Sequence, residues 1–305
     1  MNAWVACTTA AVACCSAVAL LTAQPAPSRP ALRAGIDVVT VTATVVDASG
    51  RLITGLPKEE FTVYDDSEEQ VVTQFVSQRV PVSLGVLLDV SDSMTGKRMD
   101  DARVALDRFL VDLLDQDDEA FVGVFNHRPR VIAPWTLRPS QLRGSLDGVI
   151  PTGGTAIYDA ISQSLPRFSQ RAHQRAAIVV VSDGADTASD IQLQDLRRTL
   201  RRSDAFVYAI AIDPPKKTRI NTAVDPAALR AITDDSGGFT EVVHDTADLG
   251  PATERIATEL NSQYLIGYVS PHPDDGEYHS IRVRTKNSEY RVRSRKGYVG
   301  QRAAR

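Results

Sequence analysis

The sequence predicts an α/β protein, in which a doubly wound, mainly parallel sheet carries helices on both faces and the two flanks build a β-sandwich-like module. Two patterns predict this class. Between residues 81 and 262, apolar runs of strand length alternate with amphipathic runs of helix length, which is typical of a parallel sheet. Before and after that range, apolar residues recur at every second position, and this period indicates strands.

The chain begins with 23 residues that contain no charged side chain, and small residues precede position 24. We expect an export signal at residues 1–23, cleaved after Ala23, so that the protein is secreted or lies in the periplasm or cell envelope. An uncleaved membrane anchor is the alternative, because the apolar run is nearly long enough to span a bilayer. The three cysteines (Cys7, Cys14 and Cys15) all lie here, so no disulfide is expected in the mature chain.

Residues 24–35 are rich in proline and alanine, which is typical of a flexible linker. The N-terminal β segment (36–80) and the C-terminal β segment (263–300) each offer about three strands, close to the lower limit for independent stability. We therefore expect the two segments to pair as one module, with the α/β domain (81–262) inserted between them and a short tail at 301–305. The side chains expected to meet in its core are Val39, Val41, Val63 and Val72 from the first segment, and Ile266, Tyr268, Ile281, Val283 and Val292 from the second.

Two runs of the C-terminal segment, 281–286 and 290–295, predict a hairpin around residues 287–289. Basic side chains alternate along both runs. The solvated outer face of an antiparallel sheet accounts for this alternation, and a basic groove for an anionic polymer is the alternative.

The central domain shows six runs of each kind. Pro166 falls near the end of one helical run, where it predicts a kink or an early stop. The candidate strands are 84–90, 120–125, 131–135, 177–182, 205–212 and 239–242, and the candidate helices are 98–114, 139–149, 156–168, 191–202, 226–235 and 246–261.

Oxygen-bearing side chains follow the first strand of this domain at alternate positions. Asp89, Ser91 and Ser93 come after a buried apolar run, at the carboxyl edge where open α/β sheets bind ligands. Such oxygens form a partial cage for a hard divalent cation. Ordinary turn and cap formation is the alternative, since serine and aspartate also favour those positions.

Two further segments complete the cage. Thr155 follows paired glycines at the expected start of a helix, and Asp183 ends a second buried strand. The set then offers three hydroxyls and two carboxylates, which suits Mg²⁺, or Ca²⁺ or Mn²⁺. If the hydroxyls bind directly and the acids bind through water, the ion stays electrophilic, and an open sixth position favours an acidic group of a partner.

This constellation resembles the metal-ion-dependent adhesion site of the von Willebrand factor type A domain, whose fold is a Rossmann-like doubly wound sheet. The resemblance implies that Asp89, Ser91, Ser93, Thr155 and Asp183 are the metal site. It covers residues 82–262, including a helix and Gly-Gly turn at 230–239.

The flanks add to the resemblance and one residue departs from it. Residues 55–61, 263–268 and 295–298 resemble a secreted bacterial subfamily related to this domain. Asp92 stands where the family usually has glycine, which places an extra carboxylate near the ion. Since alternate residues of an extended turn point apart, we expect Asp92 to lie outside the metal's ligands.

Composition and missing motifs narrow the function. A net charge of −4 argues against nucleic acid as an unaided partner. The chain has no nucleophile elbow, phosphate loop or dinucleotide fingerprint, so no enzyme is predicted. A hydrolase using the metal is disfavoured because no general base accompanies the cage. The five histidines are predicted at the surface or in loops and not in a zinc site.

The predicted function is therefore binding. We expect an exported, metal-dependent protein-binding or adhesion module, whose partner is a protein or an extracellular surface with an acidic group. A membrane is a partner only if the leader is uncleaved. The alternative is an assembly scaffold of a cell-envelope complex, in which the metal is structural and the β flanks make the contacts.

Overall fold

The computed structural model describes residues 38–212, 225–272 and 275–300. The predicted leader with its cysteines, the linker and the tail lie outside the described residues. Within them, the structure contains no helix whose length and apolar character would allow it to span a bilayer.

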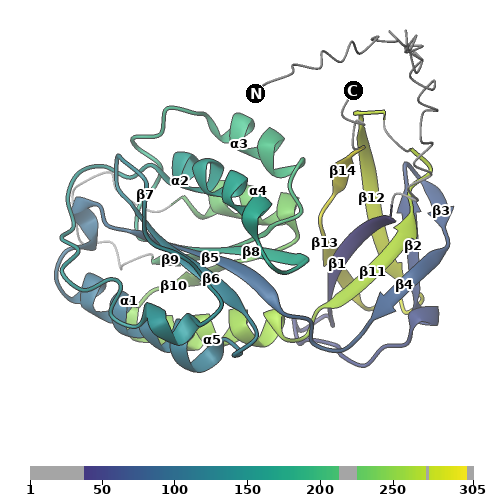
Figure 1. Cartoon of the computed structure of the whole chain (residues 1–305), viewed down its shortest axis with the longest axis horizontal. Helices are drawn as coiled ribbons and strands as arrows, with labels where there is room; N and C mark the ends of the chain where they lie inside the picture. Colours follow the sequence, from purple (N-terminus) through teal and green to yellow (C-terminus); the bar gives the residue numbers. More distant parts are fainter. Residues whose placement is uncertain (1–37, 213–224, 273–274, 301–305) are drawn as a thin grey trace, which may run out of the picture. The chain divides into compact units, whose positions relative to one another are not determined.

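A six-stranded sheet forms the centre of the α/β domain, in the order β10-β9-β8-β5-β6-β7 (Figure 1). All neighbours are parallel except β7, which runs antiparallel to β6 at one edge. The central strands β5, β6, β8 and β9 are buried along their whole length because helices cover both faces of the sheet. The strands are β5 (Val82–Asp89), β6 (Glu119–Phe125), β7 (Arg130–Thr136), β8 (Arg175–Ser182), β9 (Phe206–Ile212) and β10 (Thr240–Val243).

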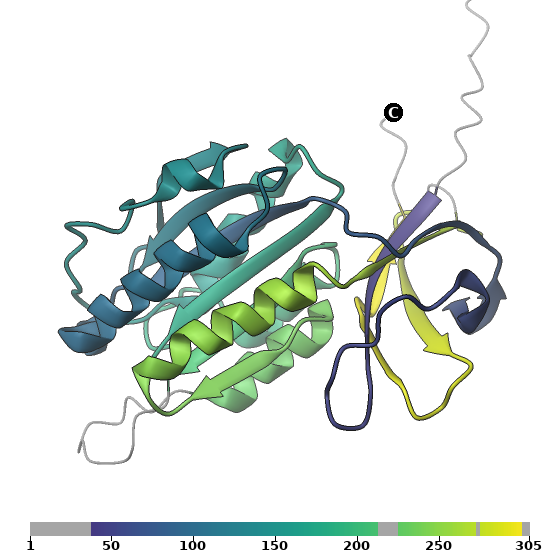
Figure 2. The same cartoon turned by 90° about the horizontal axis from the view of Figure 1, so that it is seen from below.

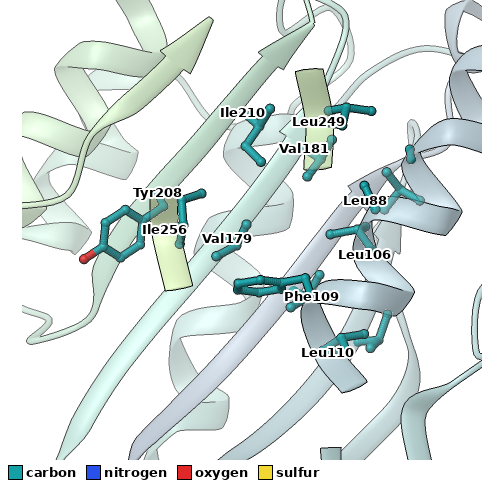
Figure 3. Close-up of a cluster of buried hydrophobic side chains, with 14 of the residues drawn as sticks. Leu88, Leu106, Phe109, Leu110, Val179, Val181, Tyr208, Ile210, Leu249 and Ile256 are labelled. Atoms are coloured by element: carbon teal, nitrogen blue, oxygen red, sulfur yellow. The ribbon is translucent and has the colours of Figure 1, made fainter. Parts of the chain in front are cut away.

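Helices α1 (Lys97–Arg108) and α5 (Leu249–Leu260) cover one face, and α2 (Ile157–Ser164), α3 (Leu193–Leu200) and α4 (Pro226–Ser236) cover the other (Figure 1). Figure 2 shows α1 and α5 side by side across the first face. In Figure 3, Phe109 and Ile256 pack with Val179 of the sheet in this cluster of buried side chains. Each such side chain contributes about 1.5–3 kcal/mol by its burial. The predicted fold class is thus confirmed.

One helix prediction is wrong, and a second helix ends early, as Pro166 predicts. Residues 139–149 do not form a helix: a single 3₁₀ turn, Pro139–Leu142, is followed by turns in which Gly144 and Gly148 both take a φ of +71°. That left-handed conformation ends a right-handed helix. In the segment 156–168, α2 ends at Ser164, and a 3₁₀ turn with Pro166 in its first positions follows, which confirms the predicted early stop.

The flanks form two four-stranded antiparallel sheets, in the orders β13-β1-β11-β4 and β14-β12-β2-β3. Both sheets mix strands from the two ends of the chain; Val39 of β1, for example, lies opposite Tyr268 of β11. All nine predicted core side chains lie in or against one cluster. The strands are β1 (Val38–Val46), β2 (Phe61–Asp65), β3 (Glu68–Gln70), β4 (Val72–Val76), β11 (Tyr264–Val269), β12 (Tyr278–Thr285), β13 (Arg291–Ser294) and β14 (Gly297–Val299).

The predicted hairpin is wrong, because β12 and β13 lie in different sheets and the chain crosses between them. The basic side chains after this crossing do not face solvent as a set. Arg293 pairs with Glu259, Arg295 donates to Thr40 O at 2.9 Å, and Lys296 pairs with Asp235. Arg293 and Arg295 thus bind the protein itself, whereas Arg282 and Arg284 of β12 are exposed at alternate positions, as the predicted solvated face requires.

The β module meets the sheet at the edge where the parallel strands begin. Arg175, the first residue of β8, donates to Val80 O and, at 2.6 Å, to Leu260 O, which bring the chain into β5 and out of α5. Close by, Gln263 donates to the Tyr208 hydroxyl at 3.0 Å. The carboxyl ends of the strands therefore lie at the opposite edge of the sheet.

Candidate metal centre

Asp89 is the last residue of β5, and its side chain is fully buried. Its Oδ1 accepts a hydrogen bond from Ser91 N at 2.8 Å, and its Oδ2 accepts one from Ser182 Oγ at 2.5 Å. These bonds fix the carboxylate and hold the chain extended at Ser91 before a 3₁₀ turn, Asp92–Met94. The alternate spacing of Ser91 and Ser93 thus places both hydroxyls at the same point.

Asp183, directly after β8, meets those serines. Ser93 Oγ donates to Asp183 Oδ1 at 2.6 Å, and the hydroxyls of Ser91 and Ser93 lie 3.0 Å apart. Because β5 and β8 are adjacent and parallel, their carboxyl ends meet at one edge, as the sequence predicts. Three of the predicted residues therefore form a continuous hydrogen-bonded group.

Thr155 reaches the same point from the loop before α2. A Cβ atom placed on Gly184 would lie 3.3 Å from Thr155 Oγ1 and 4.0 Å from Ser93 Oγ, so both hydroxyls flank that glycine. The loop is fixed by backbone bonds: Thr155 O accepts from Thr187 N at 2.8 Å, and Gly153 O accepts from Asp92 N at 2.9 Å. All five predicted residues are thus brought together.

The donor set fits a hard divalent cation. It consists only of oxygen atoms, from three hydroxyls and two carboxylates, all from side chains that are buried or half-buried. Neighbouring ligands of an octahedral Mg²⁺ ion lie about 3.0 Å apart, since each bond is about 2.1 Å long. The 3.0 Å between the Ser91 and Ser93 hydroxyls matches that separation.

The electrostatics of the site also favour a cation. Burial raises the pKa of Asp89 to about 7, and the charge of Asp183 acts in the same direction. Hydrogen bonds from Ser182 and Ser91 oppose this shift without cancelling it. A divalent ion would relieve the repulsion between the two carboxylates.

Two residues at the site were not predicted from the sequence. Arg98, in the first turn of α1, donates from Nη1 to Asp183 Oδ2 at 2.7 Å and to Ser93 O at 2.9 Å. Ser182 positions Asp89. In the sequence, Arg98 could have been identified by its position just after the motif, at the start of the helix that leaves the site. Asp92 is exposed, and its backbone holds the neighbouring loop.

Comparison with known proteins finds relatives of the α/β domain. Residues 84–185 match the family model of the von Willebrand factor type A domain. Inter-alpha-trypsin inhibitor heavy chain H2 of Sus scrofa is 21% identical over an alignment of 203 residues, and the match covers 61% of this chain and 20% of that protein. The chain thus spans about a fifth to a quarter of the length of the curated relatives it matches, with 20% and 24% covered in two of them.

Solved structures share the fold at low identity. A von Willebrand factor type A protein from Catenulispora acidiphila is 12% identical, with a TM-score of 0.52 over 88% of this chain and 74% of that one. A D319A mutant of the PilB minor pilin from Streptococcus sanguinis is also 12% identical, with a TM-score of 0.50 over 61% of this chain and 63% of that one. The segment that matches the von Willebrand factor type A domain model, residues 84–185, holds all five predicted metal-site residues.

Proposed function

We propose that this protein binds another protein or an extracellular surface through a divalent cation held at the carboxyl edge of its sheet. The observation that carries the proposal is the convergence of five oxygen-bearing side chains there, with the Ser91 and Ser93 hydroxyls at the spacing of neighbouring ligands. In this proposal the protein is a binding module and not an enzyme, and Mg²⁺ is the expected ion, with Ca²⁺ or Mn²⁺ as alternatives.

The hydroxyls of Ser91, Ser93 and Thr155 would contact the ion, and Asp89 and Asp183 would hold its waters. Hydroxyl ligands carry no charge, so the ion would keep most of its own charge and attract an Asp or Glu side chain of the partner.

Arg98 strengthens the case for an acidic partner. Its guanidinium pairs with Asp183 and its side chain is 30% exposed, which places a second positive charge at the rim of the site. Ile150, 75% exposed, lies on the segment that leads to Thr155 and offers apolar contact near the same loop.

One observation favours the second candidate, an assembly scaffold of an envelope complex. Among the described residues, the large apolar side chains that are exposed lie mostly on the β module: Val38, Val71, Val76, Val269 and Tyr278. In that case the module would make the contacts and the metal would be structural.

The proposal is tested by capture from an extract of the producing cell's surface proteins, with the intact protein as bait in Mg²⁺ or in chelator. Wild-type protein should retain a partner only with Mg²⁺, and Ser93→Ala should retain none. Ser169→Ala, which changes an exposed serine of another segment, is the matched control and should behave as wild type. A partner retained equally by Ser93→Ala would favour the scaffold instead.

A further inference from the structure

A second group of metal-ligating side chains lies in the β module, away from the metal edge. Asp65 and Asp66 end β2 and begin its turn, while His272 and His279 come from the C-terminal flank. Each offers one ligand atom, and these atoms all lie within 4.8 Å of one another. The sequence prediction that the histidines lie at the surface or in loops is wrong for His279, which is buried in β12.

The two imidazoles approach one carboxylate oxygen. Asp66 Oδ2 lies 2.7 Å from His279 Nδ1 and 3.6 Å from His272 Nε2, and the rings are parallel with centroids 3.9 Å apart. Ligands of a tetrahedral zinc ion lie about 3.3 Å apart, since each bond is about 2.0–2.1 Å long. These two separations lie on either side of that value and all the ligand atoms lie within 4.8 Å of one another, so small shifts of the side chains would bring them to a tetrahedral ion.

The atoms behind these ligands are arranged as they are around metal-bound histidines. Asp275 Oδ2 lies 2.9 Å from His279 Nε2; with the ring proton on Nε2, this carboxylate accepts it and Nδ1 keeps its lone pair for a metal. Asp65 Oδ2 accepts hydrogen bonds from the Tyr268 and Tyr298 hydroxyls, each at 2.8 Å. The ring and the carboxylate are therefore both oriented from the side opposite the cluster.

Asp65 adds an independent sign of a missing ligand. Its side chain is fully buried, yet Oδ1 has no hydrogen-bond partner among the described residues. A buried carboxylate oxygen without a partner is costly, on the order of 1–3 kcal/mol or more. A cation beside it removes that cost.

We propose that Asp65, Asp66, His272 and His279 bind a zinc-class divalent ion, with Asp275 as the residue that orients His279. Two imidazole nitrogens and two carboxylate oxygens suit Zn²⁺, whereas Mg²⁺ and Ca²⁺ prefer oxygen alone. The ion would join the β2–β3 turn to the C-terminal flank, so it would hold the two halves of the β module together. This centre is separate from the one at the carboxyl edge of the sheet.

The experiment uses the intact protein carrying Ser91→Ala and Ser93→Ala, so that it reports on this centre whether or not the other centre exists. Its three cysteines, all within residues 1–23, are blocked by alkylation. Zn²⁺ binding is followed by calorimetry, and Co²⁺ is added as a spectroscopic substitute, because four-coordinate Co²⁺ absorbs visible light far more strongly than six-coordinate Co²⁺.

We expect one bound Zn²⁺ and the strong four-coordinate Co²⁺ spectrum, both lost with His272→Ala. Since His272 is partly exposed, this variant should fold, and Asp66→Asn provides a second test at unchanged size. Asp275→Asn should weaken Zn²⁺ binding by about 10–100-fold. His244→Ala, at an exposed histidine of another strand end, should bind as the parent does.

Two results would overturn the proposal. One is a parent protein with no four-coordinate Co²⁺ spectrum, which would show that the cluster is a hydrogen-bond network in which His279 bridges Asp66 and Asp275. The other is an unchanged Zn²⁺ affinity in both His272→Ala and Asp66→Asn.

Discussion

The Lys296 ammonium group lies 3.1 Å from Asp235 Oδ1, across the boundary between the β module and the α/β domain. Asp235 is almost fully buried at the end of α4, and its other oxygen accepts from Arg197 Nε at 2.7 Å. One carboxylate thus joins α3, α4 and the C-terminal flank. Nearby, a Cβ atom on Gly237 would lie 2.6 Å from Ser294 C, so a larger residue at 237 would push the flank away.

This carboxylate predicts a pH dependence of stability. Burial acts to raise the pKa of Asp235, but hydrogen bonds from Arg197 and Lys296 outweigh it and hold the pKa below its ordinary value. A lowered folded-state pKa contributes stability that is present above the unfolded pKa, about 3.9, and is lost as pH falls through the folded value. We expect Asp235→Asn to lower the unfolding free energy at pH 7 and to flatten its decline below about pH 4.

Urea unfolding at pH 7, 4 and 3 measures this difference. Asp117→Asn, at an exposed acid, is the control and should follow the wild-type profile. A decline of equal steepness in Asp235→Asn and wild type would contradict the assignment.

Arg98 predicts opposite effects on metal and on partner. Arg98→Gln removes a positive charge that pairs with Asp183, so Mg²⁺ affinity should rise on the order of fivefold, about 1 kcal/mol. Affinity for an acidic partner should fall, and both effects should shrink at high salt. Calorimetry with Mg²⁺ at two ionic strengths checks the first effect, and a lower Mg²⁺ affinity in Arg98→Gln would count against it.

We predict that Asp92, which stands where the resembled family usually has glycine, is not a ligand of the ion. Its side chain is exposed, so Asp92→Gly should retain the metal and strengthen binding of an acidic partner by on the order of 1 kcal/mol, because a like charge is removed. Mn²⁺ binding and partner affinity are measured together. Complete loss of the metal would show that Asp92 is itself a ligand.

We predict that Arg293→Met destabilises the protein and that adding Glu259→Gln restores part of the lost stability. Arg293→Met leaves Glu259, whose side chain is 4% exposed, without its cation. Removing one partner of a buried pair costs about 3–5 kcal/mol, whereas the double variant Arg293→Met, Glu259→Gln should recover much of it. Denaturant unfolding of the two single variants and the double variant gives the coupling; additive losses would argue that the pair does not act as a unit.

The strand pairing predicts which fragments fold. In residues 24–80, β1 loses both of its neighbours, β11 and β13, and β2 loses β12, so this fragment should stay unfolded. Residues 81–262 keep the six-stranded sheet and should fold and bind Mg²⁺ alone, with lower stability. Circular dichroism and calorimetry of both fragments test this, and a folded fragment 24–80 would be the contrary result.

The sequence predicted those features that depend on local pattern. Asp89 and Asp183 end buried runs, and adjacent parallel strands must end at one edge, so their meeting followed from topology. The helix at 139–149 failed because left-handed glycines at 144 and 148 override an amphipathic pattern. The hairpin prediction was wrong because alternating apolar and polar residues indicate strands but do not show which sheet each strand joins.

Other parts of the two sites depend on contacts between distant segments. Arg98 is an ordinary helix residue until the fold places it beside Asp183. His279 faces Asp66 only because β12 pairs with β2, and no spacing within one segment shows that. Such pairs could not be predicted without the register of the sheets.

The position of the β module at the starting edge of the parallel strands has a mechanical consequence. A partner held at the carboxyl edge and a surface that holds the module would pull on opposite ends of β5 and β8. The load would then run along the strands, so the hydrogen bonds of the β5–β8 ladder would be sheared together instead of opening one at a time. A force on the proposed adhesive contact would thus be shared by many hydrogen bonds of the sheet at once.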